Sequence, residues 1–391
     1  MNPSTIPPVR RVVPTRRLSL ARAQEVLQGW VGPRAIRFFG SGTQALAAAI
    51  LDANRRRGVE APEVIIPAYG CPDLVAACVF AGVRAVPVDT YANAWGYDLS
   101  KLAAAMSDRT VAILAVNLCG IGDQASAVGE IARDRGIFLI QDSAQFLSVE
   151  ARPDWVGDYV VLSFGRGKPL NLLGGGALLL PAERFEATRT IASSMDGRAR
   201  LRRTLMSSAA AALAFNTVTM RPFYGWTASL PGLGVGQTRY SPLEKVIEDT
   251  DVLPRRFAAA LPGFQGHCGY EANRWWPVLD GWSNLGITAV RVAGSDQSPV
   301  GPLLRLPLLA ADADQRDRIV RVLGEAGLGA SAFYAQPINR IAGIPSQVAS
   351  LSRFVNAEQL AGRLFTLPTH EALGRAEVGR ADRLLRTVLN S

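Results

Sequence analysis

The stretch VVLSFGRGKPLNLLGGGALLL, residues 160–180, carries the signals that decide the fold. A run of strand formers ends at Ser163, a glycine-interrupted turn presents Lys168, and three glycines lead into a second apolar strand. A lysine held between two buried strands is costly to keep charged, so burial favours the neutral amine that a nucleophile requires. A tight hairpin with its lysine in solvent is the alternative interpretation, and the rest of the chain decides between the two.

Composition limits the class of protein. The chain has 391 residues, of which 48% are apolar and 19% charged, so we expect a globular protein with more than one packed unit. Its four cysteines, Cys71, Cys78, Cys119 and Cys268, lack the spacing of zinc ligands. This argues against both a metal site and a disulfide framework, and it favours a reducing compartment with the cytoplasm as the default.

The formal charge of +9 comes from arginine far more than from lysine. A basic chain can bind nucleic acid, anionic lipid or a phosphorylated substrate. The arginines are scattered, and no zinc-finger, RNA-recognition or helix-turn-helix pattern gathers them, so we expect no nucleic-acid binding. The arginines near the N-terminus precede no apolar segment, which argues against a secretory signal.

One segment leaves two interpretations open. Arginines within residues 198–203 precede a mostly apolar run at 205–220. A buried or interface helix with a solvated basic end is favoured, because the run is short for a bilayer crossing. Attachment to an anionic membrane surface through the arginines is the alternative.

The order of the elements predicts an α/β fold. Strand and helix signals alternate from residue 63 to 180, which is typical of a mostly parallel sheet covered by helices on both faces. We divide the chain into an N-terminal arm and helix (1–30), a large domain (31–260) and a smaller C-terminal α+β domain (261–391). Within them we also expect a charged helix at 241–261 and a strand at 328–334.

Ligands of such sheets bind at the carboxyl ends of the strands. The polar residues at those ends are Asp142 with Gln145, Ser163 with Lys168, Asn117, and the turn at 69–73. The small residues from Gly40 to Thr43 precede an alanine-rich helix. A helix N-terminus of this kind suits a phosphate, although a capped helix start is the simpler interpretation.

Taken in order, several pieces of the chain resemble the DegT/DnrJ/EryC1/StrS family of sugar aminotransferases. They are GSGTQAL, VIIPAYGCPDLV, VRAVPVDT, IQDSAQ, SFGRGK with the glycine cluster, and LGASAFYAQPI. The family belongs to fold type I of the enzymes that use pyridoxal 5′-phosphate (PLP). The resemblance therefore implies this fold, PLP as cofactor, small-molecule substrates, and a homodimer with active sites at the subunit interface.

The resemblance also implies roles for single residues. Lys168 matches the lysine that forms a Schiff base with PLP and shuttles a proton, and Asp142 matches the carboxylate that pairs with the pyridinium nitrogen. Gln145 would lie near the phenolic oxygen, and Ala144 would pack on one ring face. The expected phosphate contacts are Gly42, Thr43 and Ser163.

The chain departs from the family pattern in two places. Cys71 stands where many members have an aromatic residue that stacks on the cofactor ring, and a thiol gives a smaller contact. The segment by which members commonly reach the partner's cofactor phosphate has no clear counterpart, and residues 238–240 are the nearest candidate.

The function we favour is that of a PLP-dependent aminotransferase in polysaccharide or secondary-metabolite biosynthesis. It would move an amino group from an amino acid, glutamate above all, to a keto sugar or a related keto substrate. A PLP-dependent lyase on the same fold is one alternative. A non-catalytic or weakly PLP-binding relative with an assembly or regulatory role is another, and Cys71 supports it. Related sugar dehydratases carry histidine in place of the lysine, so Lys168 argues against them.

Overall fold

The computed structural model describes most of the chain. The described residues are 5–7, 10–12, 18–122, 124–185, 193–194, 209–220, 224, 238–267, 272–294, 303–349, 351 and 353–390. The arginines at 198–203, the first part of the apolar run at 205–220 and Cys268 lie outside them.

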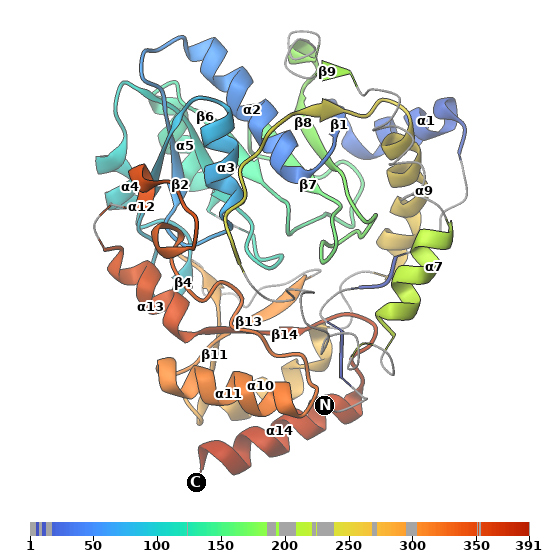
Figure 1. Cartoon of the computed structure of the whole chain (residues 1–391), viewed down its shortest axis with the longest axis vertical. Coiled ribbons are helices and arrows are strands. Elements are labelled where there is room, and N and C mark those ends of the chain that lie inside the picture. The colour runs from blue at the N-terminus through green and yellow to red at the C-terminus, as the bar shows by residue number, and fades with distance from the viewer. Residues whose placement is uncertain are drawn as a thin grey trace.

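A nine-stranded sheet forms the centre of the larger unit (Figure 1). In spatial order its strands are β3 (Arg84–Val88), β2 (Glu63–Pro67), β5 (Thr110–Val116), β6 (Phe138–Asp142), β7 (Tyr159–Ser163), β8 (Gly176–Pro181), β1 (Arg34–Phe39), β10 (Ile247–Glu248) and β9 (Ser193–Ser194). The five strands from β3 to β7 are parallel, whereas β8 runs antiparallel to both of its neighbours. The predicted mostly parallel sheet is therefore confirmed.

Helices cover both faces of this sheet, because successive strand residues point to opposite sides. Leu114 of β5 lies in a hydrophobic cluster with α2 (Gly42–Arg57) and α3 (Asp73–Phe80). The preceding residue, Ile113, lies in a cluster with α4 (Leu99–Ala105) and α5 (Ala125–Asp134). Further along the same sheet, α1 (Leu20–Val31) and α9 (Val252–His267) pack over β7 and β8.

The C-terminal part forms a smaller sheet with its own helices. Its strands are β11 (Thr288–Ala289), β13 (Arg305–Leu309) and β14 (Leu364–Pro368). Its helices are α10 (Trp276–Ser283), α11 (Ala313–Glu325), α12 (Ser346–Ala349), α13 (Val355–Arg363) and α14 (Arg375–Leu389), with 3₁₀ turns at Ala272–Arg274 and Ile338–Arg340. The two parts join through a shared core and through β12 (Arg291–Val292), which pairs with β4 (Ala94–Trp95).

Two expected elements differ in the structure. The helix expected at 241–261 begins only at Val252, after the short strand β10, and the boundary placed between residues 260 and 261 lies inside this helix. The strand expected at 328–334 is an irregular loop in which Ser331 forms a single bridge to Thr366. The proposed division into domains otherwise stays a prediction.

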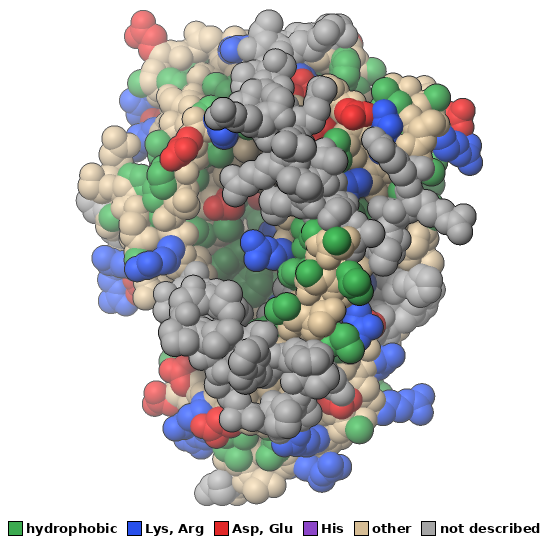
Figure 2. Space-filling model, turned by 45° about the vertical axis from the view of Figure 1, so that its right-hand side comes forward, with side chains coloured by type: hydrophobic (Ala, Val, Ile, Leu, Met, Phe, Trp, Pro, Cys, Tyr) green, Lys and Arg blue, Asp and Glu red, His purple; other side chains and the backbone are tan. Residues whose placement is uncertain are grey.

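The apolar run contributes α7 (Ala209–Val218), part of which lies at the surface. Within the described ranges, no helix is long and apolar enough to cross a membrane. On the face shown in Figure 2, the described Lys and Arg side chains are spread among acidic and apolar ones.

Candidate active site

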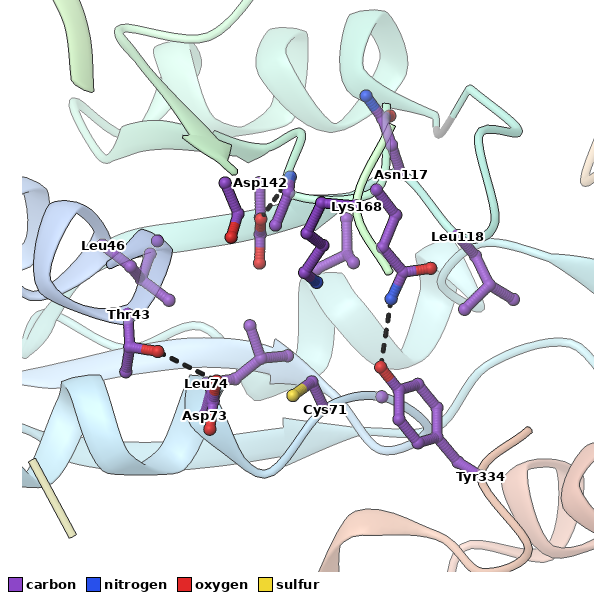
Figure 3. Close-up of a pocket in the computed structure, with 16 residues that line it drawn as sticks. Thr43, Leu46, Cys71, Asp73, Leu74, Asn117, Leu118, Asp142, Lys168 and Tyr334 are labelled. Carbon is purple, nitrogen blue, oxygen red and sulfur yellow. Dashed lines mark hydrogen bonds between the residues drawn. The ribbon is translucent and has the colours of Figure 1, made fainter. Parts of the chain in front are cut away.

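A cavity opens at the carboxyl ends of the parallel strands, with an empty volume of about 550 Å³. The turn after β2, the end of β5, the end of β6 and the β7–β8 loop all contribute to its wall, and α2 closes one end. All seven site residues expected from the sequence line it: Gly42, Thr43, Cys71, Asp142, Gln145, Ser163 and Lys168 (Figure 3). Side chains far apart in the sequence thus meet where the strand order predicted.

Lys168 is placed by a compact loop between β7 and β8. Phe164 fastens this loop: its carbonyl accepts hydrogen bonds from the amides of Leu172 and Gly174, at 2.9 and 3.1 Å. Gly176 permits a close approach of α2, because a Cβ there would lie 2.5 Å from the backbone of Ser41. Lys168 is half-buried, and its ammonium group makes no hydrogen bond or ion pair in the described part of the chain.

Asp142 ends β6 and is buried, with 7% of its surface exposed. One carboxylate oxygen accepts a hydrogen bond from the amide of Ala144 at 2.9 Å, and the other points into the cavity (Figure 3). Burial raises the pKa of Asp142, and the charge of Asp73 raises it further. The Ala144 amide and the charge of Lys168 act in the opposite direction.

The start of α2 forms the expected anion-binding end of the cavity. Ser41 caps the helix by accepting a hydrogen bond from the amide of Gln44 at 3.2 Å. Gly42 faces Ser163 so closely that a Cβ would lie 2.7 Å from the Ser163 Cβ. The first-turn amides of a helix have no partner within the helix and carry the positive end of its dipole.

A carboxylate also lies at this end of the cavity. The hydroxyl of Thr43 donates a hydrogen bond to Oδ2 of Asp73, in the first turn of α3, at 2.9 Å (Figure 3). The sequence placed Asp73 only within a polar turn and gave it no role. Thr43, one of the expected phosphate contacts, therefore already donates its hydroxyl hydrogen bond to a carboxylate of the same chain.

Gln145 connects two parts of the chain. Its Oε1 accepts a hydrogen bond from the amide of Cys119 at 2.8 Å, and its Nε2 donates to the hydroxyl of Tyr334 at 3.0 Å. Tyr334 belongs to the irregular loop at 328–334 and was not expected at the site, although it lies in the quoted segment LGASAFYAQPI. The side chain of Cys71 lies beside the Tyr334 hydroxyl. Burial raises the pKa of the Cys71 thiol to about 12.

Two further predictions concern the surroundings. Asn117 lines the cavity and donates a hydrogen bond from its side chain to the hydroxyl of Ser143 at 2.8 Å. In the segment 238–240, the amide of Tyr240 donates a hydrogen bond to the carbonyl of Ala342, and the expected contact of this segment with a partner's cofactor phosphate stays a prediction. Among the residues that the structure describes, no cluster of three or more His, Cys, Asp or Glu side chains could hold a metal ion.

Comparison with known proteins identifies the family. A sequence profile of the DegT/DnrJ/EryC1/StrS aminotransferase family matches residues 24–217 and 287–384, which is most of the chain. The chain belongs to this family. The resemblance that the motifs indicated is thereby confirmed.

Relatives in the family catalyse reactions on different substrates. The 3-amino-5-hydroxybenzoate synthase of Amycolatopsis mediterranei is 31% identical over 152 residues, which are 37% of this chain and 38% of that protein. The GDP-perosamine synthase of Escherichia coli O157:H7 is 28% identical over 142 residues, 36% of this chain and 38% of that protein. The alignments thus span about two fifths of the length of these relatives.

Solved structures of low sequence identity share the fold over nearly the whole chain. NtdA from Bacillus subtilis, with bound cofactor PMP, superposes with a TM-score of 0.69 at 17% identity and covers 96% of this chain and 78% of its own. The PLP form of Spr1654 from Streptococcus pneumoniae, a sugar aminotransferase by its description, gives 0.68 at 15% identity and covers 99% of each chain. The family fold therefore extends into the C-terminal part.

Proposed function

We propose that this chain is a PLP-dependent aminotransferase that moves an amino group from an amino acid, with glutamate as the expected donor, to a keto sugar or related keto substrate. The observation that carries the proposal is the convergence of Lys168, Asp142 and the N-terminus of α2 on one cavity. A nucleophilic amine, a buried carboxylate and an anion-binding helix end are three different requirements of one cofactor. Family membership and the names of the relatives add support.

The residues of the cavity fit this cofactor. The free oxygen of Asp142 could accept the proton of a pyridinium nitrogen. The side-chain nitrogen of Lys168, which makes no hydrogen bond or ion pair in the described part of the chain, could add to an aldehyde as the neutral amine and release water. The absent Cβ of Gly42 lets Ser163 and the amides of α2 approach one phosphate group together. When bound, PLP supplies an electron sink that stabilises a carbanion next to the transferred nitrogen.

Each residue then has a definable task. Asp142 stays ionised opposite the ring nitrogen once that nitrogen carries a proton, because the opposite charge offsets the cost of its burial. Lys168 in its neutral form would take a proton from the substrate carbon and return it to the cofactor carbon on the other side of the transferred nitrogen. The loop held by the Phe164 carbonyl places the lysine in the cavity at the carboxyl ends of the strands.

The chain offers a direct test, because it contains only three lysines, Lys101, Lys168 and Lys245. We expect purified protein with added PLP to develop a visible absorbance band that L-glutamate removes. Borohydride reduction before glutamate is added should attach the cofactor to the peptide that contains Lys168. The variant Lys168→Arg should lose the band, while Lys101→Arg and Lys245→Arg keep it. Cofactor attached to another lysine, or a band that survives in Lys168→Arg, would refute the assignment.

A second candidate is a non-catalytic relative that binds PLP weakly or not at all and serves an assembly or regulatory role. The carboxylate of Asp73 at the anion-binding end and the small side chain of Cys71 favour it. No visible band at any PLP concentration would select this candidate. A band that glutamate leaves unchanged while another amino acid is consumed would instead favour a lyase on the same fold.

The assembly and location of the protein also stay proposals. A homodimer in the cytoplasm is what the family resemblance and the cysteine content favour. Light scattering coupled to size-exclusion chromatography measures the oligomeric state, and a monomer that is fully active would contradict the dimer.

A further inference from the structure

Tyr334 is the one aromatic side chain among the described residues that line the cavity. It does not come from the parallel sheet but from the irregular loop before the 3₁₀ turn Ile338–Arg340, in the C-terminal part. In Figure 3 its ring lies beside Cys71, and its hydroxyl points along the hydrogen bond to the Gln145 amide. The C-terminal part thus completes a wall that the large sheet leaves open.

Three contacts fix the position of this ring. Gln145 donates a hydrogen bond to its hydroxyl at 3.0 Å, and the hydroxyl of Tyr69 donates one to its backbone carbonyl at 3.0 Å. The ring of Tyr69 packs edge-on against it with centroids 5.8 Å apart. Both partners belong to the large unit, so Tyr334 is held from across the boundary between the two sheets.

The backbone before Tyr334 is strained. Phe333 has φ +58°, in the left-handed region that a bulky aromatic residue rarely adopts. Such strain persists where the surrounding contacts over-determine the conformation, and it is concentrated at ligand sites. The left-handed conformation of Phe333 turns the backbone so that the Tyr334 side chain enters the cavity. The Phe333 ring packs beside the Tyr334 ring, with centroids 4.4 Å apart.

Cys71 and Tyr334 occupy neighbouring volume. The Cys71 side chain lies next to the Tyr334 hydroxyl in the cavity wall (Figure 3). A ring at position 71 would extend into the space that this hydroxyl fills, so only one of the two positions can carry a large side chain in this arrangement. A flat heteroaromatic ring gains from contact with another ring, and Ala144 elsewhere in the wall offers only a methyl group.

We propose that Tyr334 is the aromatic residue that contacts the cofactor ring in this chain, and that residue 71 is a cysteine because the Tyr334 hydroxyl occupies the space beside it. The inference rests on the proposed function, since it assumes that PLP binds in this cavity. It assigns to the C-terminal part a positioning role in cofactor binding that is distinct from the covalent role of Lys168.

Binding of PLP to the unliganded full chain tests the inference without measuring turnover. Quenching of tryptophan fluorescence on titration with PLP gives the dissociation constant, and thermal unfolding of each unliganded variant reports whether it is folded. The variants are Tyr334→Ala, Tyr334→Phe, Cys71→Phe and the double variant Cys71→Phe/Tyr334→Ala. Tyr91→Ala, at a tyrosine that does not line the cavity, is the matched control.

The expected pattern is a reciprocal one. Tyr334→Ala should weaken PLP binding about tenfold, because a ring contact is lost, while Tyr334→Phe should stay within about threefold of the parent. Cys71→Phe alone should also weaken binding, because its ring collides with Tyr334. The double variant should bind PLP with a dissociation constant within about threefold of that of the parent, since the ring at position 71 replaces the one lost at position 334.

Two outcomes would overturn the inference. If Tyr334→Ala binds PLP as the parent does, the ring makes no useful contact. If Cys71→Phe weakens binding equally with and without Tyr334, the two positions do not share one space. A parent chain that binds no PLP at all would overturn the proposed function together with this inference, so the two failures are distinguishable.

Discussion

Asp142 meets opposing demands in the liganded and unliganded protein. Burial and the charge of Asp73 raise its pKa, so the folded chain binds this proton more tightly than the unfolded chain does. The charged form therefore destabilises the unliganded protein once the pH rises above the ordinary range of an aspartate. The same charge is what a pyridinium nitrogen needs.

We expect Asp142→Asn to separate these two effects. The amide keeps the acceptor for the Ala144 amide and removes the buried charge, so the unliganded variant should unfold at a higher temperature at pH 7, by about 2 °C. PLP binding should weaken about tenfold or more, because the ring nitrogen loses its partner. Calorimetry at pH 7 and pH 4 checks the first effect, which should shrink at the lower pH. If Asp142→Asn is less stable than the parent at both pH values, the predicted gain in stability is contradicted.

Asp73 gives a second prediction at the same scale. Its carboxylate accepts the Thr43 hydroxyl at the helix end where a phosphate dianion would bind, and like charges this close repel strongly. Asp73→Asn keeps the hydrogen bond and removes the charge, so PLP should bind about tenfold more tightly.

A probe without the phosphate provides the control for this prediction. Pyridoxal lacks the dianion, so its affinity should not change in Asp73→Asn. The exposed residue Asp134, at the end of α5, supplies the matched variant Asp134→Asn. Equal gains for PLP and pyridoxal would show that Asp73 acts on the cavity's shape and not on the phosphate charge.

The sequence identified the cavity residues that follow strands and missed the one that does not. Asp142 and Ser163 end parallel strands, and parallel strands end at one edge, so their proximity follows from the alternation of elements. Tyr334 bonds to Gln145 across 189 positions of the chain, from a loop without regular structure. No periodic pattern encodes such a contact, which depends on how the C-terminal part packs against the large sheet.

At the scale of elements, the start of α9 at Val252 is set by a tertiary contact and not by the helix propensity of the residues before it. The charged residues 241–251 are compatible with a helix, but the amide of Ile247 donates to the side chain of Gln44 at 2.9 Å and thereby fixes β10 at the sheet. Asp249 then accepts hydrogen bonds from the amides of Asp251 and Val252, at 3.1 and 2.9 Å, which starts the helix there. The local sequence contains the cap, whereas the Gln44 side chain that holds β10 lies 203 positions away in the chain.

The contact between the start of β8 and α2 gives a prediction at the scale of elements. A Cβ at Gly176 would lie 2.5 Å from the backbone of Ser41, and neither backbone can yield without moving the start of α2. Gly176→Ala should therefore lower the free energy of unfolding by about 2 kcal/mol and weaken PLP binding as well. Gly324→Ala, in an open position of α11, should stabilise the chain by about 0.5–1 kcal/mol. Urea unfolding compares the two, and unchanged PLP affinity in a destabilised Gly176→Ala would show that α2 had not moved.

For the whole molecule, the N-terminal arm connects parts that are distant in sequence. Ile6 is 1% exposed and its amide bonds to the carbonyl of Gly327 in the C-terminal part. Val12 exchanges two hydrogen bonds with the side chain of Asn216 in α7. The described residues of the N-terminal arm thus pack on their own chain.

His370 fastens this arm and makes the stability of the molecule depend on pH. Its Nε2 lies 2.6 Å from the carbonyl of Pro7, and its Nδ1 accepts the amide of Ala372 at 3.3 Å, so the neutral ring fits both partners. Burial above all, together with the charges of Arg305 and Arg10, lowers the pKa of His370 to about 4, against the opposite influence of Glu371 and of the Pro7 carbonyl. The unfolded chain therefore takes up this proton at a higher pH than the folded chain does, and stability is lost as the pH falls.

The resulting loss should amount to about 3 kcal/mol of unfolding free energy between pH 6.5 and pH 4. His370→Gln can donate to Pro7 and accept from Ala372 but does not titrate, so its stability should fall less over this range. His267→Gln, which removes the chain's other histidine, should keep the pH dependence of the parent. Urea unfolding at several pH values measures the difference. Parallel curves for the parent and His370→Gln would mean that acid destabilises the molecule elsewhere, whereas a smaller loss of stability in His370→Gln than in the parent would place the loss at the junction of the arm with the C-terminal part.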